Sequence, residues 1–174
     1  MDEQVSRRKT LTPEQAYVKI RHFCAFQERT QEEVKRKLSG YGISWNDANV
    51  LISKLIEEGF LNEERFAKSF AGGKFRMKGW GRKKIEMELK MRKVSAYSIR
   101  KAIMEEIDLK DYEKTLQKLF EKKWNSLKGP DNTLYTKQAK TRQYLLSRGF
   151  ENDIISRIMK SYLNGETDHH NGTD

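Results

Sequence analysis

The chain has 174 residues and a net charge of +10, from 35 Lys and Arg against 25 Asp and Glu. Such a charge favours a polyanionic partner, either a nucleic acid or an acidic protein, although salt-bridged helix faces alone can give the same balance. The single cysteine, Cys24, excludes an internal disulfide, and no apolar run reaches the ~18 residues that a membrane span requires. Because no signal peptide is recognisable either, we expect a cytoplasmic protein without a membrane anchor.

Apolar residues recur at helical spacing along almost the whole chain, which has only two prolines. This periodicity predicts an all-α fold of nine helices in three groups. The predicted parts are a flexible N-terminus over 1–11, three-helix groups over 12–61, 62–109 and 110–164, and a flexible tail over 165–174.

Group one has the clearest helix start signals. Thr12-Pro13-Glu14 combines an N-cap, a proline at the first helical position and an acidic first turn. Thr30 and Glu33 form a capping box for the second helix, and Ser44 predicts the start of the third. Cys24 falls on the apolar stripe of the first helix, so we interpret it as a buried structural residue rather than a nucleophile.

Group two is predicted to begin at Asn62, with Phe66, Phe70 and Met77 along one inward face of its first helix. The pair Gly72-Gly73 interrupts that helix, and each glycine costs about 1 kcal/mol relative to alanine. We therefore expect either a bend or the close approach of another backbone at this pair.

Group three is predicted to open near Asp111, after a last helix of group two that Ser95 caps. The segment 128–132 carries a loop signal that separates the first two helices of the group. Trp124 lies beside the apolar stripe of the first of these helices, so we expect it in the core.

The three groups share one pattern at the end of their second helix. A leucine is followed four residues later by a turn residue and then by an apolar residue, in the stretches Val34–Leu38 with Gly42-Ile43, Ile85–Leu89 with Lys93-Val94, and Thr141–Leu145 with Gly149-Phe150. The leucines are 51 and 56 residues apart. This recurrence predicts three tandem repeats of one three-helix unit, forming an elongated, curved array.

Residues able to carry catalysis are scattered. The histidines are His22 and the tail residues His169 and His170, and a polar tail explains the latter pair better than a metal site. No phosphate-binding glycine loop and no His, Cys, Asp and Glu set with metal-ligand spacing is present. We therefore predict no catalytic residue, no metal and no cofactor.

The densest basic segment is 74–93, where nine Lys and Arg residues accompany only Glu86 and Glu88, a local balance of +7. Trp80 lies in its middle, in a glycine-flanked turn before a helix. Helix N-termini favour phosphate, and basic side chains there oppose the helix dipole, so we interpret the segment as an anion-binding surface. The alternative is that Trp80 plugs the core and the lysines form a solvated face.

A more diffuse basic set occupies group three, where a solvated face explains the charge equally well. Group one is nearer neutral and is the better candidate for protein contact. The candidate residues for binding DNA or a protein–DNA filament are Lys74, Arg76, Lys78, Trp80, Arg82, Lys83, Lys84, Lys90, Arg92, Lys137, Lys140, Arg142 and Arg148.

Three stretches resemble elements of the RecX family of bacterial recombination regulators: Leu61–Ala67, Gly81–Leu89, and Leu145 with Arg148-Gly149-Phe150. The repeated leucine and turn pattern is similar as well. The chain departs from the family at Asn62 and Glu63, where aspartates are frequent, and at Lys93, where a glycine usually ends the helix. It also starts close to its first helix, so it resembles a short member.

The resemblance implies three tandem three-helix repeats, each distantly like a helix-turn-helix unit, and a non-enzymatic modulator of the RecA recombinase. Such a protein is expected to lie in the groove of the RecA–single-stranded DNA filament and to inhibit ATPase activity and strand exchange. Direct contact with single- or double-stranded DNA is also implied, and we expect a monomer. The alternative hypothesis is a stand-alone DNA-binding protein that acts without RecA.

Overall fold

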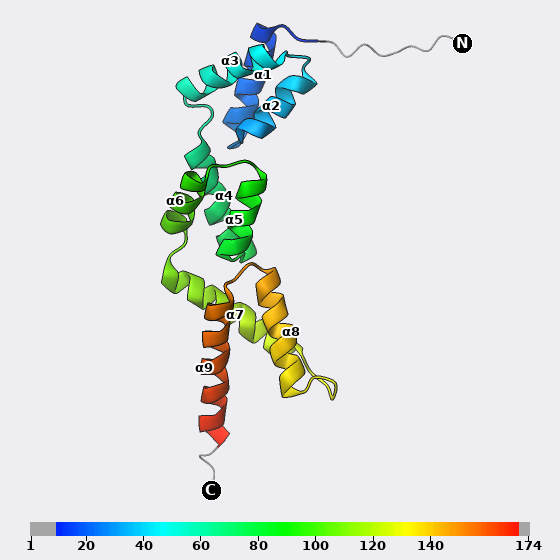
Figure 1. Cartoon of the computed structure of the whole chain (residues 1–174), viewed down its shortest axis with the longest axis vertical. Helices are drawn as coiled ribbons and strands as arrows, with labels where there is room; N and C mark the ends of the chain where they lie inside the picture. The colour runs from blue at the N-terminus through cyan, green and yellow to red at the C-terminus, as the bar shows by residue number, and fades with distance from the viewer. Residues whose placement is uncertain (1–9, 171–174) are drawn as a thin grey trace, which may run out of the picture.

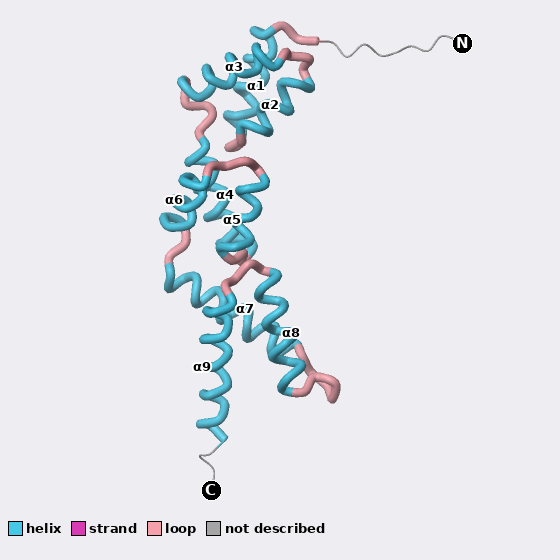
Figure 2. Tube along the Cα trace, viewed as in Figure 1, coloured by secondary structure: helices cyan, strands magenta, loops and turns pink. Residues whose placement is uncertain are grey.

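The computed structural model describes residues 10–170 of the chain, with side chains as far as residue 165. This part contains nine α-helices and no strand (Figures 1 and 2). The helices are α1 (Pro13–Phe26), α2 (Gln31–Gly40), α3 (Trp45–Glu57), α4 (Glu63–Lys78), α5 (Arg82–Met91), α6 (Ala96–Glu106), α7 (Leu109–Ser126), α8 (Leu134–Ser147) and α9 (Asn152–His170). Among them none combines the length and the apolar character needed to cross a membrane.

The helices begin at side chains that accept hydrogen bonds from the first turn. Five predicted caps are confirmed, at Thr12, Thr30, Ser44, Asn62 and Ser95. Both threonines form complete capping boxes, and Pro13 occupies the first helical position of α1. Helix α7 starts earlier than predicted, because Asp108 accepts hydrogen bonds from the amides of Lys110 and Asp111.

The second helix of each group ends in the same geometry, which confirms the tandem repeat. The apolar residue after the turn donates its amide hydrogen bond back to the leucine carbonyl, from Ile43 to Leu38, from Val94 to Leu89 and from Phe150 to Leu145, each at 3.2 Å. The turn residues are left-handed, with φ of 78° at Gly42, 58° at Lys93 and 91° at Gly149. All three leucines are fully buried.

The three repeats follow one another along the longest axis of the molecule (Figure 1). They do not have three separate cores. Helices α1–α3 and Leu61 form one hydrophobic cluster, whereas α4–α9 form a second, continuous cluster. Tyr112 connects repeats 2 and 3 within it, because its ring lies 5.9 Å from that of Phe75 and 5.0 Å from that of Phe150.

Repeat 1 contacts repeat 2 mainly through polar groups. Arg65 forms an ion pair with Glu28 and donates a hydrogen bond to the carbonyl of Gly59 at 2.9 Å. Lys93 forms a second ion pair with Glu32, at 3.3 Å. A cleft of about 240 Å³ is bordered by residues of both repeats, including Glu32 and Lys93.

Two expectations about α4 are wrong. Met77 is 81% exposed, and Phe75 takes the inward position instead, because the last turn of α4 faces Tyr112 of the next repeat. The helix also runs unbroken through the glycine pair. Gly72 is buried, and an added Cβ would meet the guanidinium of Arg76 and a carboxylate oxygen of Glu106, so side chains rather than a backbone approach it.

The last helix is longer than predicted. Helix α9 extends to His170, through six residues of the segment that was predicted as a tail. Residues 1–9 and 171–174, including most of the predicted flexible N-terminus, lie outside the described residues.

Candidate nucleic-acid interface

Repeat 2 presents two aromatic rings beneath lysine side chains. The rings of Phe70 and Trp80 meet edge to face, with centroids 6.4 Å apart. The ammonium group of Lys74 lies 5.3 Å from the first ring and 5.1 Å from the second, and that of Lys84 lies 4.6 Å from the Trp80 ring. Trp80 is half-buried against the core, so it packs inward and also carries cations on its surface.

Two further lysines extend this surface. Lys78 at the end of α4 and Lys83 in the first turn of α5 are exposed, and within residues 10–170 neither forms an ion pair. We call Phe70, Lys74, Lys78, Trp80, Lys83 and Lys84 the basic face of repeat 2. The face combines positive charges with aromatic surface, which are the two components that nucleic-acid-binding grooves use.

Three other predicted residues of this segment are engaged in ion pairs. Arg76 pairs with Glu106 and Lys90 with Glu86, and both basic side chains are largely exposed. Such surface ion pairs contribute little to stability, so these two side chains can exchange their carboxylate partners for others. Arg92 is held more firmly, because it donates hydrogen bonds to both the carboxylate and the backbone carbonyl of a single residue, Glu88.

The N-terminus of α5 is not a free anion site, which corrects the sequence-based interpretation. Three amides at the start of this helix donate hydrogen bonds to repeat 3. Gly81 N donates to the carbonyl of Arg148 at 2.8 Å, Arg82 N to the hydroxyl of Tyr112 at 3.0 Å, and Lys83 N to the carbonyl of Gly149 at 3.0 Å. These donors are 30 to 67 residues from their acceptors in the sequence, so no local pattern indicated them. These three amides are therefore not available to a bound phosphate.

Two predicted site residues join repeats 2 and 3 instead of facing solvent. The guanidinium of Arg82 stacks 4.3 Å from the ring centroid of Tyr112. Arg148 reaches the end of α4 and donates to the carbonyl groups of Lys78 and Gly79. Both arginines are half-buried and shape the interface between the repeats.

The hydroxyl of Tyr112 is central to the same interface. It donates a hydrogen bond to Glu151 at 2.6 Å while it accepts the one from the amide of Arg82. Burial and the bond to Glu151 raise the pKa of Tyr112, so the hydroxyl stays protonated and remains a donor. Its two partners lie 30 and 39 residues away in the sequence, so no local pattern indicates this polar role.

The predicted site residues of repeat 3 each contact a different part of this repeat. Lys137 lies 4.5 Å from the centroid of Trp124, which is buried as predicted. Lys140 donates to the side chain of Asn132 at 2.9 Å. Arg142 bonds to side chains at the start of α9, so it supports the fold of this repeat. In Figure 1, α5 and α8 project to the same side of the long axis.

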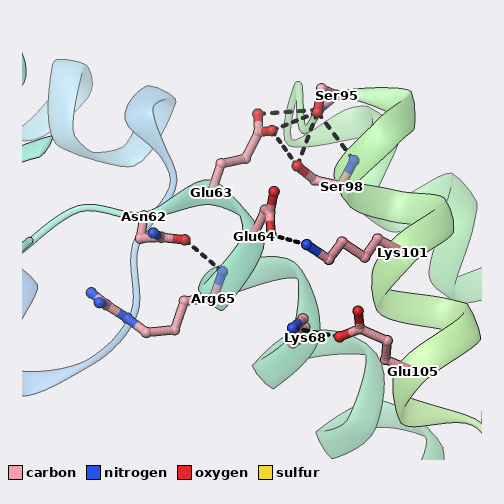
Figure 3. Close-up of polar contacts among 9 residues, drawn as sticks. All are labelled: Asn62, Glu63, Glu64, Arg65, Lys68, Ser95, Ser98, Lys101 and Glu105. Carbon is pink, nitrogen blue, oxygen red and sulfur yellow. Dashed lines mark hydrogen bonds and ion pairs between the residues drawn. The ribbon is translucent and has the colours of Figure 1, made fainter.

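The stretch 61–67 is structural throughout. Asn62 caps α4, and Glu63 reaches across to the N-terminus of α6, where it accepts hydrogen bonds from Ser95 and from Ser98 Oγ at 2.7 Å (Figure 3). Burial opposes ionisation of Glu63, but these hydrogen bonds outweigh it, and the pKa of Glu63 is lowered.

Further polar contacts continue along the pair α4 and α6. Glu64 forms an ion pair with Lys101 at 2.8 Å, and Lys68 forms one with Glu105 (Figure 3). The polar residues of this motif therefore fix α6 on α4, and they do not form a chemical site.

The chain also matches two known protein domains. Residues 62–103 match the domain described as "RecX, second three-helix domain", and residues 111–159 match "RecX, third three-helix domain". The chain belongs to the RecX family. Both matched segments coincide with repeats whose helices share one core.

Named RecX relatives extend the similarity beyond these two domains. The regulatory protein RecX of Clostridium perfringens (strain 13 / Type A) is 32% identical over 138 residues, which are 79% of this chain and 64% of that protein. That of Vibrio campbellii is 29% identical over 84% of this chain and 89% of the relative. The crystal structure of RecX from Lactobacillus salivarius has a TM-score of 0.76 and 26% identity, covering 86% of this chain and 95% of that one.

This chain thus spans less than two thirds of the length of the clostridial RecX protein. The relatives are named as regulatory proteins, which agrees with the prediction that the chain is not an enzyme. Burial raises the pKa of the Cys24 thiol to about 11, so it is not a nucleophile at neutral pH. No group of His, Cys, Asp and Glu among the described residues could hold a metal ion.

Proposed function

We propose that this RecX protein regulates the RecA recombinase by binding the RecA–single-stranded DNA filament and inhibiting its ATPase activity and strand exchange. The observation that carries the proposal is the pair of RecX three-helix domains, which share one core and present the basic face of repeat 2. RecA is the proposed partner. A cytoplasmic location and a monomeric state belong to the same proposal.

The elongated shape supports a filament as the target. Repeats arranged along one axis offer a long surface, which suits an extended partner better than a small molecule. The lysines of the basic face would meet the negative charge of the DNA. We leave Arg82, Arg148 and Arg142 out of the proposed contact, because they make contacts between repeats or helices.

The test is DNA-stimulated ATP hydrolysis by RecA, measured with increasing amounts of the RecX protein. We expect hydrolysis to fall as the protein is added. Unchanged hydrolysis at several-fold excess over RecA would overturn the proposal. A pull-down of RecA with and without single-stranded DNA and nucleotide then tells whether the filament or free RecA is bound.

The second candidate is a DNA-binding protein that acts without RecA. The arrangement of Lys74 and Lys84 over Trp80 favours it, because this arrangement needs no second protein to contact DNA. A variant that lacks Lys74, Lys83 and Lys84 separates the candidates. If it loses DNA binding but still inhibits RecA, the basic face is not the inhibitory surface.

A further inference from the structure

Repeat 1 carries a second aromatic surface, which shares no residue with the basic face of repeat 2. A groove of about 770 Å³ between α1 and α2 is lined by Phe23, Phe26 and Tyr41. Phe26 is 87% exposed, the highest value among the large apolar side chains of the described residues. An aromatic ring left this open contributes nothing to the core and is available to a partner.

The groove is positively charged. Lys19 and Lys37 supply its charge, and Lys37 lies 5.4 Å from the Phe23 centroid and 5.8 Å from that of Tyr41. The adjoining hollow adds Arg36 and one carboxylate, Glu33.

That carboxylate does not neutralise the groove. Glu33 accepts a hydrogen bond from the Thr30 amide at 2.8 Å, because it completes the capping box of α2. It also lies 3.9 Å from Arg29. The cations that line the groove are therefore left to attract an external anion.

The aromatic surface continues to the other side of α2. Arg36 borders a further hollow that is lined by Lys35, Trp45 and Glu32, whose carboxylate is paired with Lys93 at 3.3 Å. Trp45 is 74% exposed. Phe26, Arg36 and Trp45 thus mark a path across repeat 1 on which exposed rings alternate with basic side chains.

We infer that repeat 1 binds single-stranded nucleic acid along this path. Bases would stack on Phe26 and Trp45, and the phosphates between them would meet Lys19, Lys37 and Arg36. Separate flat rings flanked by cations suit successive bases, whereas an acidic protein segment would be better served by one enclosed apolar socket. A duplex keeps its bases stacked inside, so the path would discriminate in favour of a single strand.

This inference does not rest on RecA binding and goes beyond the phosphate contacts proposed for repeat 2. It assigns strand preference to repeat 1 and charge contact to repeat 2. The test therefore omits RecA and uses the full chain.

Fluorescence anisotropy of a labelled oligothymidylate of about 15 nucleotides measures single-strand binding, and a duplex of equal length serves as comparison. In the double variant Phe26→Ala/Trp45→Ala, we expect single-strand affinity to fall about tenfold or more, from the loss of two stacking positions. Duplex affinity should remain within about twofold, because duplex contact uses phosphates only. Both residues are exposed, so the variant should keep its helical circular dichroism.

The control is Val18→Ala/Val50→Ala, which removes two exposed apolar side chains of the same repeat, 55% and 67% exposed, that do not line the groove. It should bind both oligonucleotides like the unaltered protein. Unchanged single-strand affinity of Phe26→Ala/Trp45→Ala overturns the inference. If the variant keeps this affinity but no longer retains RecA in the separate pull-down, the path is a protein-docking surface instead.

Discussion

Gly81 packs against the backbone of Gly149, and a Cβ added to Gly81 would overlap the carbonyl oxygen of Gly149. The contact brings the start of α5 onto the turn between α8 and α9, where Lys83 N also bonds to this carbonyl at 3.0 Å. Repeats 2 and 3 therefore meet through backbone at this point, which only a residue without a side chain permits.

The first prediction concerns this contact. Gly81→Ala should lower the free energy of unfolding by about 1–3 kcal/mol, because a methyl group forces two backbones apart. Gly73→Ala is the matched control, since its added Cβ meets no atom within 4 Å and its helix is continuous. It should raise stability by about 0.5–1 kcal/mol. Urea unfolding compares the two, and equal effects would contradict the role of the glycine contact.

The second prediction uses the one repeat whose turn lacks glycine. Lys93→Gly should stabilise the protein by about 0.5–1 kcal/mol, because Lys93 has a φ of 58° that glycine adopts without strain. The substitution also removes the ion pair with Glu32. Because the Lys93 side chain is largely exposed, losing this pair should cancel little of the gain in stability. Lys90→Gly in the preceding helix should destabilise instead, by about 1 kcal/mol. A loss of stability in Lys93→Gly would show that the ion pair outweighs the backbone.

The third prediction concerns the hydroxyl between the repeats. Tyr112→Phe should lower the free energy of unfolding by about 1–3 kcal/mol, because the carboxylate of Glu151 and the amide of Arg82 both lose a partner in a half-buried position. Tyr135→Phe is a suitable control, since Tyr135 is 79% exposed. Thermal unfolding measures both, and indistinguishable midpoints would rule out a structural role for the hydroxyl.

The fourth prediction is a pH dependence. The pKa of Glu63 is lowered in the folded state, so its stabilising contribution is present above its ordinary value of 4.5 and is lost as pH falls through the lower folded value. The stability gap between the unaltered protein and Glu63→Gln should therefore be widest at neutral pH and should narrow on acidification. A gap that grows toward acid pH would contradict the assigned hydrogen bonds.

The fifth prediction addresses the basic face of repeat 2. If four lysines neutralise four phosphates, DNA affinity should fall roughly 150-fold between 50 and 200 mM salt. The variant Lys74→Ala/Lys83→Ala/Lys84→Ala should bind more weakly and reduce the slope of log affinity against log salt by about 3. Lys110→Ala/Lys114→Ala/Lys160→Ala removes the same charge from α7 and α9. Equal slopes for both variants would mean that net charge alone attracts DNA.

Local signals predicted the helices well, because their causes lie within one turn of sequence. Thr12, Thr30 and Asn62 each bond to an amide three residues on, and a pattern of that range can be read directly. The same rule was ambiguous before α7. Asp108 and Asp111 are equally good caps, and only the three-dimensional chain path shows which one is used.

The candidate site was only partly predictable, because its charges are assigned by distant contacts. Composition placed Lys83, Arg82 and Arg92 in one basic segment. The structure leaves the lysine exposed, stacks Arg82 on a tyrosine 30 residues away and binds Arg92 to Glu88. Nothing near these residues in the sequence distinguishes a free cation from one that holds two repeats together.

The division into two cores has a mechanical meaning. Repeats 2 and 3 can change their relative orientation only by opening a shared hydrophobic core, so α4–α9 behave as a stiff rod. Repeat 1 is held to this rod by the ion pairs Glu28–Arg65 and Glu32–Lys93, each worth no more than about 1 kcal/mol. Among the described residues, the boundary next to Leu61 is therefore the weakest connection between repeats. We expect any adjustment of the bend to the pitch of a long partner to take place there.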